Sequence, residues 1–204
     1  MTVIIDYGLG NKSSILRVFD RLKSSTKLSS DPLEILAADK IILPGVGHFS
    51  QGMKNLEEMG LISVLNEAVL VKKIPVLGIC LGMQLMTNFS EEGNIKGLGW
   101  VNAETLKIKT SLKIPHVGWN TLNIKNSNSI LKNITETDQF YFVHSYSIHC
   151  NEAQDVLSTT LYSEDPKSFG FVSSFQKENI FGTQFHPEKS HSQGLKIIQN
   201  FINV

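Results

Sequence analysis

The pentapeptide Gly78-Ile79-Cys80-Leu81-Gly82 constrains the fold more than any other segment of the chain. It joins residues 75–79, an apolar run that is typical of a buried central strand, to residues 81–89, which we expect to form a helix. A thiol on a tight turn between such a strand and helix, flanked by glycines, is the nucleophile-elbow pattern with Cys in place of Ser. The free backbone N–H groups that begin the helix favour a thiolate, so Cys80 is a candidate nucleophile. Burial as a small apolar side chain is the alternative for Cys80, and it is our reading of Cys150, which lacks such a turn.

Short β-branched runs alternate with stretches of helical periodicity in the first half of the chain. Strands are predicted at residues 3–5, 40–43 and 75–79, with helices between them, one of which is broken at Gly60. From residue 97 onward, alternating runs predict further strands, some of them antiparallel, at residues 100–108, 114–122 and 140–148. A capping box that begins at Ser190 predicts a C-terminal helix. We therefore predict one α/β domain, residues 1–204, with an open, mostly parallel central sheet, flanking helices and additional antiparallel strands.

The composition limits the kinds of molecule that we expect the protein to bind. The formal net charge is zero and basic clusters are short, so we expect no nucleic-acid partner. Two cysteines cannot build the disulfide framework of a small secreted domain. The N-terminus carries no basic leader and no apolar run approaches the roughly 18 residues of a membrane span, so we predict a cytoplasmic protein without a membrane partner.

The segment that ends in Phe185-His186-Pro187-Glu188 supplies a base and a carboxylate. If the strand before it ends at the same edge of the sheet as the elbow, His186 can accept the thiol proton and later protonate a leaving amine. Glu188 would then fix the imidazole tautomer and support its charged form. For an isolated His-x-Glu pair, a strand-end histidine and a solvated carboxylate are the simpler interpretation. The elbow in the same chain makes Cys80, His186 and Glu188 a candidate catalytic triad.

The tetrapeptide Pro44-Gly45-Val46-Gly47 follows a predicted strand and is rich in glycine. Acyl transfer needs N–H donors for the tetrahedral oxyanion, and the backbone at Val46 and Gly47 is a candidate source. The N–H of Leu81 would be the second donor. A simple glycine-rich turn is the alternative, and the segment differs from the phosphate-binding loop patterns, so we expect no nucleotide cofactor.

Three motifs together resemble those of the triad-type, class I glutamine amidotransferases in order and spacing: residues 44–47, residues 78–84 and residues 185–188. Within that family, residues 4–11, 115–120 and 141–146 look like the corresponding segments of the glutaminase subunits of imidazole glycerol phosphate synthases. The likeness extends over the whole chain. It implies a flavodoxin-like class I amidotransferase fold and no cofactor.

The resemblance also implies a reaction and a partner. Glutamine would be hydrolysed to glutamate through a thioester on Cys80, and ammonia would pass to a cyclase subunit of histidine biosynthesis within a heterodimer. By the same matching, glutamine would be held by Gly45, Gly47, Gln84, Glu92, Ser145 and Tyr146, with Glu92 facing the ammonium group. The surface that meets the partner would carry Trp119, Asn120, Tyr141 and Lys189. For Trp119 and Tyr141, packing in a strand-side core is the alternative.

Three other functions match parts of the sequence. Residues 90–93, 97–100 and 188–191 are similar to relatives that feed ammonia to surface-polysaccharide sugar synthesis. A catalytically degenerate regulatory subunit is a second alternative, and the intact Cys80, His186 and Glu188 argue against it. A metalloprotein is a third, but no histidine pair shows a recognisable ligand pattern, so we expect no metal.

Overall fold

Parallel strands form one half of the central sheet, in the spatial order β2-β1-β3-β4-β14. The computed structural model describes residues 1–126, 129–164 and 170–204. This order is that of a flavodoxin-like doubly wound sheet, in which ligands bind at the carboxyl ends of the strands. The bounds of these strands are β1 (Thr2–Ile5), β2 (Thr26–Ser29), β3 (Lys40–Leu43), β4 (Val76–Ile79) and β14 (Ile180–Thr183).

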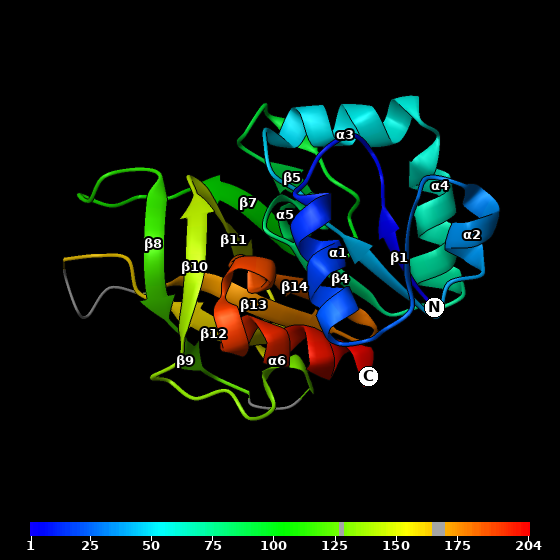
Figure 1. Cartoon of the computed structure of the whole chain (residues 1–204). Coiled ribbons are helices and arrows are strands. Elements are labelled where there is room, and N and C mark those ends of the chain that lie inside the picture. Colours follow the sequence, from blue (N-terminus) through cyan, green and yellow to red (C-terminus); the bar gives the residue numbers. More distant parts are fainter. Residues whose placement is uncertain (127–128, 165–169) are drawn as a thin grey trace.

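Antiparallel pairing extends the sheet beyond β14, through β13 and β11 to β7, and a parallel β7–β5 pair continues it to β6. Strand β12 pairs with β13 and β9, while β8 and β10 form a separate two-stranded sheet. Figure 1 shows β8 and β10 side by side at the end of the molecule away from β1. The bounds are β5 (Phe89–Ser90), β6 (Ile95–Lys96), β7 (Ala103–Lys107), β8 (His116–Thr121), β9 (Asn123–Ile124), β10 (Gln139–His144), β11 (Tyr146–Cys150), β12 (Val156–Thr160) and β13 (Phe171–Lys177).

Strands β1, β3 and β4 are buried on both faces, which explains their continuous hydrophobic runs. Val3 and Ile5 of β1 belong to one buried cluster, and Ile4 between them belongs to another. Because successive side chains of a strand point to opposite faces, the sheet separates two cores. Helices therefore cover both faces.

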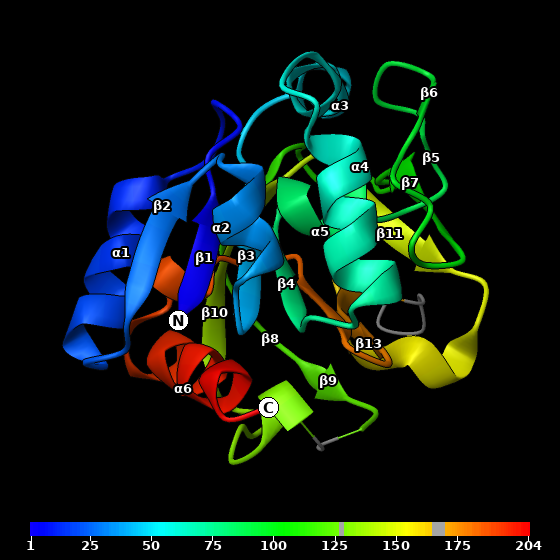
Figure 2. The same cartoon turned by 90° about the vertical axis from the view of Figure 1, so that its right-hand side faces the viewer.

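The helices divide between these two cores. Helix α1 (Lys12–Arg21) and helix α6 (His191–Ile202) bury apolar residues against the face that carries Ile4. The opposite face is covered by α2 (Pro32–Leu36), α3 (Phe49–Glu58), α4 (Leu61–Asn66) and α5 (Leu81–Leu85). Figure 2 shows β1 between α1 on one side and α2 on the other. A π-helical turn, Glu67–Val71, continues α4, and 3₁₀ turns occur at Ser129–Leu131, Ala153–Asp155 and Pro187–Lys189.

The predicted fold class is confirmed, and the predicted helix break at Gly60 separates α3 from α4. Three local predictions are wrong in detail. The helix after the elbow ends at Leu85 rather than at residue 89. The carbonyl groups of Leu85 and Met86 accept hydrogen bonds from Leu98 and Trp100, so tertiary contacts replace the next helical turn.

The other two corrections concern breaks in the chain path. The predicted strand 140–148 is two strands, β10 and β11, which lie in different sheets and are separated at Ser145. Ser190 precedes α6 as predicted but makes no side-chain capping bond. Its hydroxyl instead donates to the His186 carbonyl and accepts from the Tyr141 N–H. Within the described ranges, no helix is both long and apolar enough to cross a membrane.

Candidate active site

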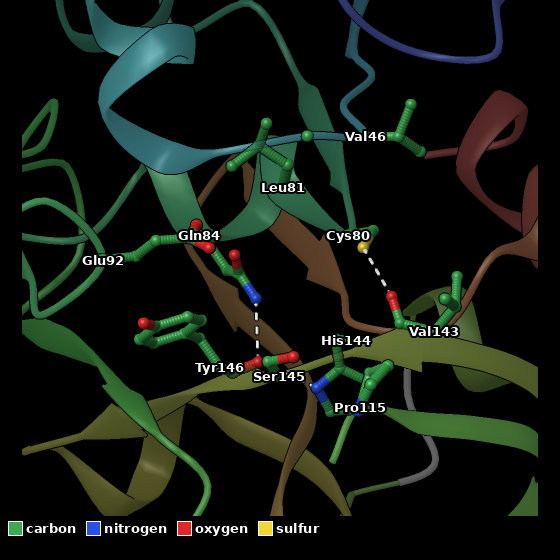
Figure 3. Close-up of a pocket in the computed structure, with 11 residues that line it drawn as sticks. Val46, Cys80, Leu81, Gln84, Glu92, Pro115, Val143, His144, Ser145 and Tyr146 are labelled. Carbon is green, nitrogen blue, oxygen red and sulfur yellow. Dashed lines mark hydrogen bonds between the residues drawn. The ribbon is translucent and has the colours of Figure 1, made fainter.

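Cys80 occupies a strained turn between β4 and α5. Its backbone angles are φ 52° and ψ −108°, a combination that non-glycine residues rarely adopt and that costs on the order of 1–3 kcal/mol. The Cys80 N–H donates to the Thr183 carbonyl at 2.7 Å, and the Cys80 carbonyl accepts from the Gln84 N–H at 3.1 Å. These bonds hold the turn, and Figure 3 shows the sulfur at the edge of a cavity.

The two glycines near Cys80 allow the backbone to pack closely. A Cβ atom on Gly82 would lie 1.8 Å from the Leu43 carbonyl oxygen, and one on Gly78 would lie 2.7 Å from the Met83 nitrogen. The end of β3 can therefore approach the start of α5 only because Gly82 has no side chain. This contact brings the loop after β3 beside the elbow.

His186 and Glu188 form a buried pair directly after β14. His186 Nδ1 lies 2.8 Å from Glu188 Oε1, and their side chains are 1% and 2% exposed. Because a carboxylate only accepts hydrogen bonds, Nδ1 carries the proton and Nε2 is the atom free for chemistry. Among the described residues, Nε2 has no hydrogen-bond partner.

The charge state of His186 depends on its two neighbours. Burial lowers the pKa of the imidazole, but the negative charge of Cys80 and the bond with Glu188 outweigh burial and raise the pKa to about 10. Cys80 is thus close enough to His186 for a thiolate to stabilise the charged ring. The arrangement therefore favours the protonated, positively charged form of the His186 ring.

The candidate oxyanion residues meet the elbow at one cavity. Val46, Gly47 and Leu81 all line it together with Cys80, and Gly47 has a φ of +124°, which favours glycine. Tyr7, which is fully buried, donates from its hydroxyl to the Pro44 carbonyl at 2.5 Å and so fixes the start of this loop. Backbone donors from the loop after β3 and from the first residue of α5 can therefore face one reacting carbonyl.

The cavity has a volume of about 270 Å³, enough for a small polar molecule. Most of the candidate substrate residues line it, namely Gly47, Gln84, Glu92, Ser145 and Tyr146. One Glu92 carboxylate oxygen accepts from the Phe49 N–H at 2.8 Å, which fixes its direction. Gly45 is not part of the lining, and a Cβ there would lie 2.7 Å from the Leu81 Cβ. The structure thus gives Gly45 a packing contact beside the cavity.

The candidate interface residues gather around the β8–β10 pair. Trp119, which is 43% exposed, packs edge-on against Tyr141 with ring centroids 5.9 Å apart. Lys189 Nζ lies 5.5 Å from the centroid of the Tyr141 ring. Asn120 donates from its side chain to the Leu161 carbonyl. The Tyr141 carbonyl also accepts from the His186 N–H at 2.9 Å, so this surface adjoins the candidate triad.

Sequence reasoning missed buried polar residues beside the cavity. Gln184 is fully buried, and its Nε2 lies 3.6 Å from the sulfur of Cys80. His144 lines the cavity and hydrogen-bonds to His116 at 3.1 Å. The spacing of Gln184 two residues before His186 was an available signal, because residues two apart in an extended segment point to the same side.

A metal site would need several ligand side chains in one place. Across residues 1–126, 129–164 and 170–204, no group of three or more His, Cys, Asp and Glu side chains is arranged to bind a metal ion. Both cysteines are free thiols. Burial is the largest of the effects that raise the pKa of Cys150 to about 12, which agrees with its interpretation as a structural residue.

Known proteins resemble this chain over its full length. It is 49% identical to imidazole glycerol phosphate synthase subunit HisH 2 of Methanococcus maripaludis, over 99% of this chain and 98% of that protein. It is 43% identical to imidazole glycerol phosphate synthase subunit HisH 1 of Campylobacter jejuni strain RM1221, over the whole of both chains.

Solved structures share the fold at low sequence identity. A glutamine amidotransferase crystal structure superposes with a TM-score of 0.74 at 15% identity, covering 98% of this chain and 97% of the other. A glutamine amidotransferase from Thermotoga maritima superposes with a TM-score of 0.64 at 18% identity, covering 99% of this chain and 82% of the other. The profile of the family described as glutamine amidotransferase class-I matches residues 3–204. The chain belongs to the class-I glutamine amidotransferase family.

Proposed function

We propose that this chain is the glutaminase subunit of an imidazole glycerol phosphate synthase, acting in the cytoplasm as a single domain. It hydrolyses glutamine to glutamate and delivers ammonia to a cyclase subunit of histidine biosynthesis, with which it forms a heterodimer. The observation that carries the proposal is the buried His186–Glu188 pair beside the strained Cys80 turn, at a cavity of about 270 Å³. The full-length similarity to two HisH subunits supports the same reaction.

The chemistry follows from the geometry of the three side chains. Cys80 gives its proton to His186 Nε2, and the thiolate attacks the carboxamide carbon of glutamine. The carbon–nitrogen bond then breaks as the imidazolium protonates the nitrogen, which leaves as ammonia and creates a thioester. Water, deprotonated by His186, hydrolyses the thioester to glutamate and regenerates the thiol. Glu188 keeps the ring oriented and offsets its positive charge throughout.

The cavity lining suits glutamine. The Glu92 carboxylate pairs with the α-ammonium group of the substrate, as a charge-assisted contact requires. Both N–H groups of the Gln84 amide are already donated, to the Tyr146 carbonyl and to Gln184 Oε1. Gln84 therefore meets the substrate through its carbonyl oxygen, which accepts from the ammonium or carboxamide group. The N–H groups near Val46, Gly47 and Leu81 face the oxyanion.

The experiment that tests the function compares two nitrogen sources in the assembled synthase. The Cys80→Ser variant, combined with the cyclase, should lose glutamine-dependent synthesis and retain synthesis from ammonium salts. Cys150→Ser is the matched control and should retain both activities, because Cys150 lies outside the cavity lining. Loss of both activities in Cys80→Ser would contradict an ammonia-donor role.

The identity of the molecule that accepts the ammonia needs its own experiment. Methanococcus maripaludis has both a HisH 1 and a HisH 2, and these are 42% and 49% identical to this chain. When one organism has two such subunits, one of them can supply ammonia to an acceptor other than that of histidine biosynthesis, such as a surface-polysaccharide sugar. Complementation of a histidine auxotroph that lacks its own glutaminase subunit distinguishes the two: growth without histidine supports the histidine pathway.

A further inference from the structure

Gln184 contacts the sulfur of Cys80, although it has no role in the proposed glutaminase reaction. Its Nε2 lies 3.6 Å from Cys80 Sγ, within hydrogen-bond reach of a sulfur atom. The residue is completely buried and does not line the cavity. Because this amide is buried, water cannot replace it as a donor to the sulfur when Gln184 is substituted.

The direction of this hydrogen bond is fixed by Gln84. Gln84 Nε2 donates to the Tyr146 carbonyl at 3.0 Å and to Gln184 Oε1 at 2.9 Å. A backbone carbonyl can only accept, so the nitrogen of Gln84 must face Tyr146 and its second N–H remains for Gln184. Gln184 therefore turns its oxygen toward Gln84 and its nitrogen toward the sulfur.

The Tyr146 carbonyl is itself held in place by a second donor. His144 Nδ1 lies 2.8 Å from it, and Nε2 of the same ring lies 3.1 Å from His116 Nδ1. Because the carbonyl needs a donor, His144 carries its proton on Nδ1 and accepts from His116 on Nε2. A continuous chain of directed hydrogen bonds thus runs from β8 to the Gln184 amide.

We propose that Gln184 is a further catalytic residue, whose Nε2–H donates to the Cys80 thiolate and holds the sulfur charged and oriented before it attacks the substrate. The proposal rests on the proposed function for the use of that thiolate, but the hydrogen bond is measurable without glutamine.

The chemical consequence depends on pH. When Cys80 passes its proton to His186, negative charge develops on a buried sulfur, and an N–H donor favours that charged form. In the thioester the sulfur carries no charge, so the donor matters most before attack. Loss of the donor therefore lowers the thiolate population near neutral pH, and a higher pH restores it.

The direct test is alkylation of Cys80 by iodoacetamide between pH 5 and 10, in a Cys150→Ser background. Gln184→Met keeps the side-chain length but removes both the donor to the sulfur and the acceptor for Gln84, whereas Gln184→Glu removes only the donor. Both should alkylate about tenfold more slowly at pH 7 and approach the parent rate at high pH. Gln176→Met is the matched control, because it makes the same substitution at a glutamine whose Nε2 donates to the Glu178 carbonyl, outside the cavity lining. Its alkylation profile should equal that of the parent.

A second measurement needs no variant at Gln184 and so does not depend on how such variants fold. The side-chain amide resonance of Gln184, observed by nitrogen-15 NMR, should shift with pH along the alkylation profile of the parent protein. Alkylation profiles of Gln184→Met and Gln184→Glu that coincide with the parent profile, or an amide resonance that ignores the titration, would overturn the proposal.

Measurements of glutamine turnover distinguish a failure of the role of Gln184 from a failure of the proposed function. In the complex with the cyclase, Gln184→Glu, which keeps the acceptor that orients Gln84, should lower kcat for glutamine hydrolysis about tenfold at pH 7 and recover by pH 9, with KM within twofold. A merely structural role would lower kcat equally at every pH. If the parent protein fails to hydrolyse glutamine while the alkylation profiles shift as expected, the proposed function fails and the role of Gln184 stands.

Discussion

The backbone N–H of Cys80 donates to the carbonyl of Thr183 across 2.7 Å, and this bond joins the nucleophile to the strand that carries the base. Strands β4 and β14 are parallel neighbours, with Ile79 opposite Thr183. Both strands therefore end at the same edge of the sheet, and His186 lies three residues after Thr183. Sheet register places sulfur and imidazole together, although they are far apart in sequence.

Replacing Glu188 by Gln tests how the ring is held. The amide keeps an acceptor for His186 Nδ1–H but removes the negative charge that helps to raise the pKa of the imidazole. We expect kcat for glutamine hydrolysis to fall about 100-fold, with KM little changed. Glu178→Gln, at an exposed carboxylate paired with Lys73, should change kcat less than twofold. A Glu188→Gln variant within threefold of the parent would show that the charge is not needed.

Replacing Gly82 by Ala tests the close contact between β3 and α5. The added Cβ would lie 1.8 Å from the Leu43 carbonyl oxygen, so the backbone must shift. We expect the free energy of unfolding, measured by urea denaturation, to fall by about 3 kcal/mol or more. Gly52→Ala is the control, since its Cβ would meet the flexible end of Leu85 at 3.1 Å and should change stability by less than about 1 kcal/mol. Equal effects would refute the packing argument.

The buried histidine pair predicts a loss of stability in acid. The pKa of His116 is lowered by burial to about 4, and the pKa of His144 is lowered, mainly by burial, to about 3. Below the unfolded value of about 6.5, the unfolded chain binds protons that the native chain does not, so stability falls as pH drops. Between pH 6 and 4.5 each histidine should contribute a slope of up to roughly 1.4 kcal/mol per pH unit.

The measurement is urea denaturation across this pH range for the parent and for His116→Phe. Removing one titrating ring should reduce the slope by up to roughly 1.4 kcal/mol per unit, whatever the change in overall stability. Identical slopes in the two proteins would mean that His116 does not stay neutral in the fold.

We predict that the proposed cyclase partner docks on the exposed aromatic surface of β8. Trp119→Ala should raise the Kd of the heterodimer about tenfold or more, because exposed aromatics are frequent anchors of interfaces. Leu33→Ala is the matched control, since Leu33 is the more exposed of the two at 77% and lies on α2. Isothermal titration calorimetry compares them, and an equal Kd for both variants would place the interface elsewhere.

The sequence predicted the elements whose signal is local. Apolar runs identify β1, β3 and β4, and the glycines around Cys80 identify the turn. Elements set by tertiary contacts were missed or misplaced. Strand β2 is a short, half-buried edge strand without a clear alternation, and α5 ends early because Leu98 and Trp100 take its carbonyl groups.

The residues of the candidate site also fall into those that a local motif predicts and those that only tertiary contacts determine. Cys80, His186 and Glu188 lie on short motifs that carry their own chemical pattern. His116 and His144 lie on β8 and β10, and no pattern in their immediate sequence shows that these strands pair and bring the two rings together beside the cavity. The partners of a buried polar side chain depend on sheet order, which no local pattern encodes.

The thioester chemistry of Cys80 is the central claim, and a glutamine-like electrophile tests it most directly. The protein, in complex with the cyclase, is incubated with 6-diazo-5-oxo-norleucine, and the adduct is located by peptide mass spectrometry. We predict one adduct per chain, on Cys80, with excess glutamine slowing its formation. An unmodified Cys80, or an adduct on Cys150 that glutamine does not slow, would contradict the account.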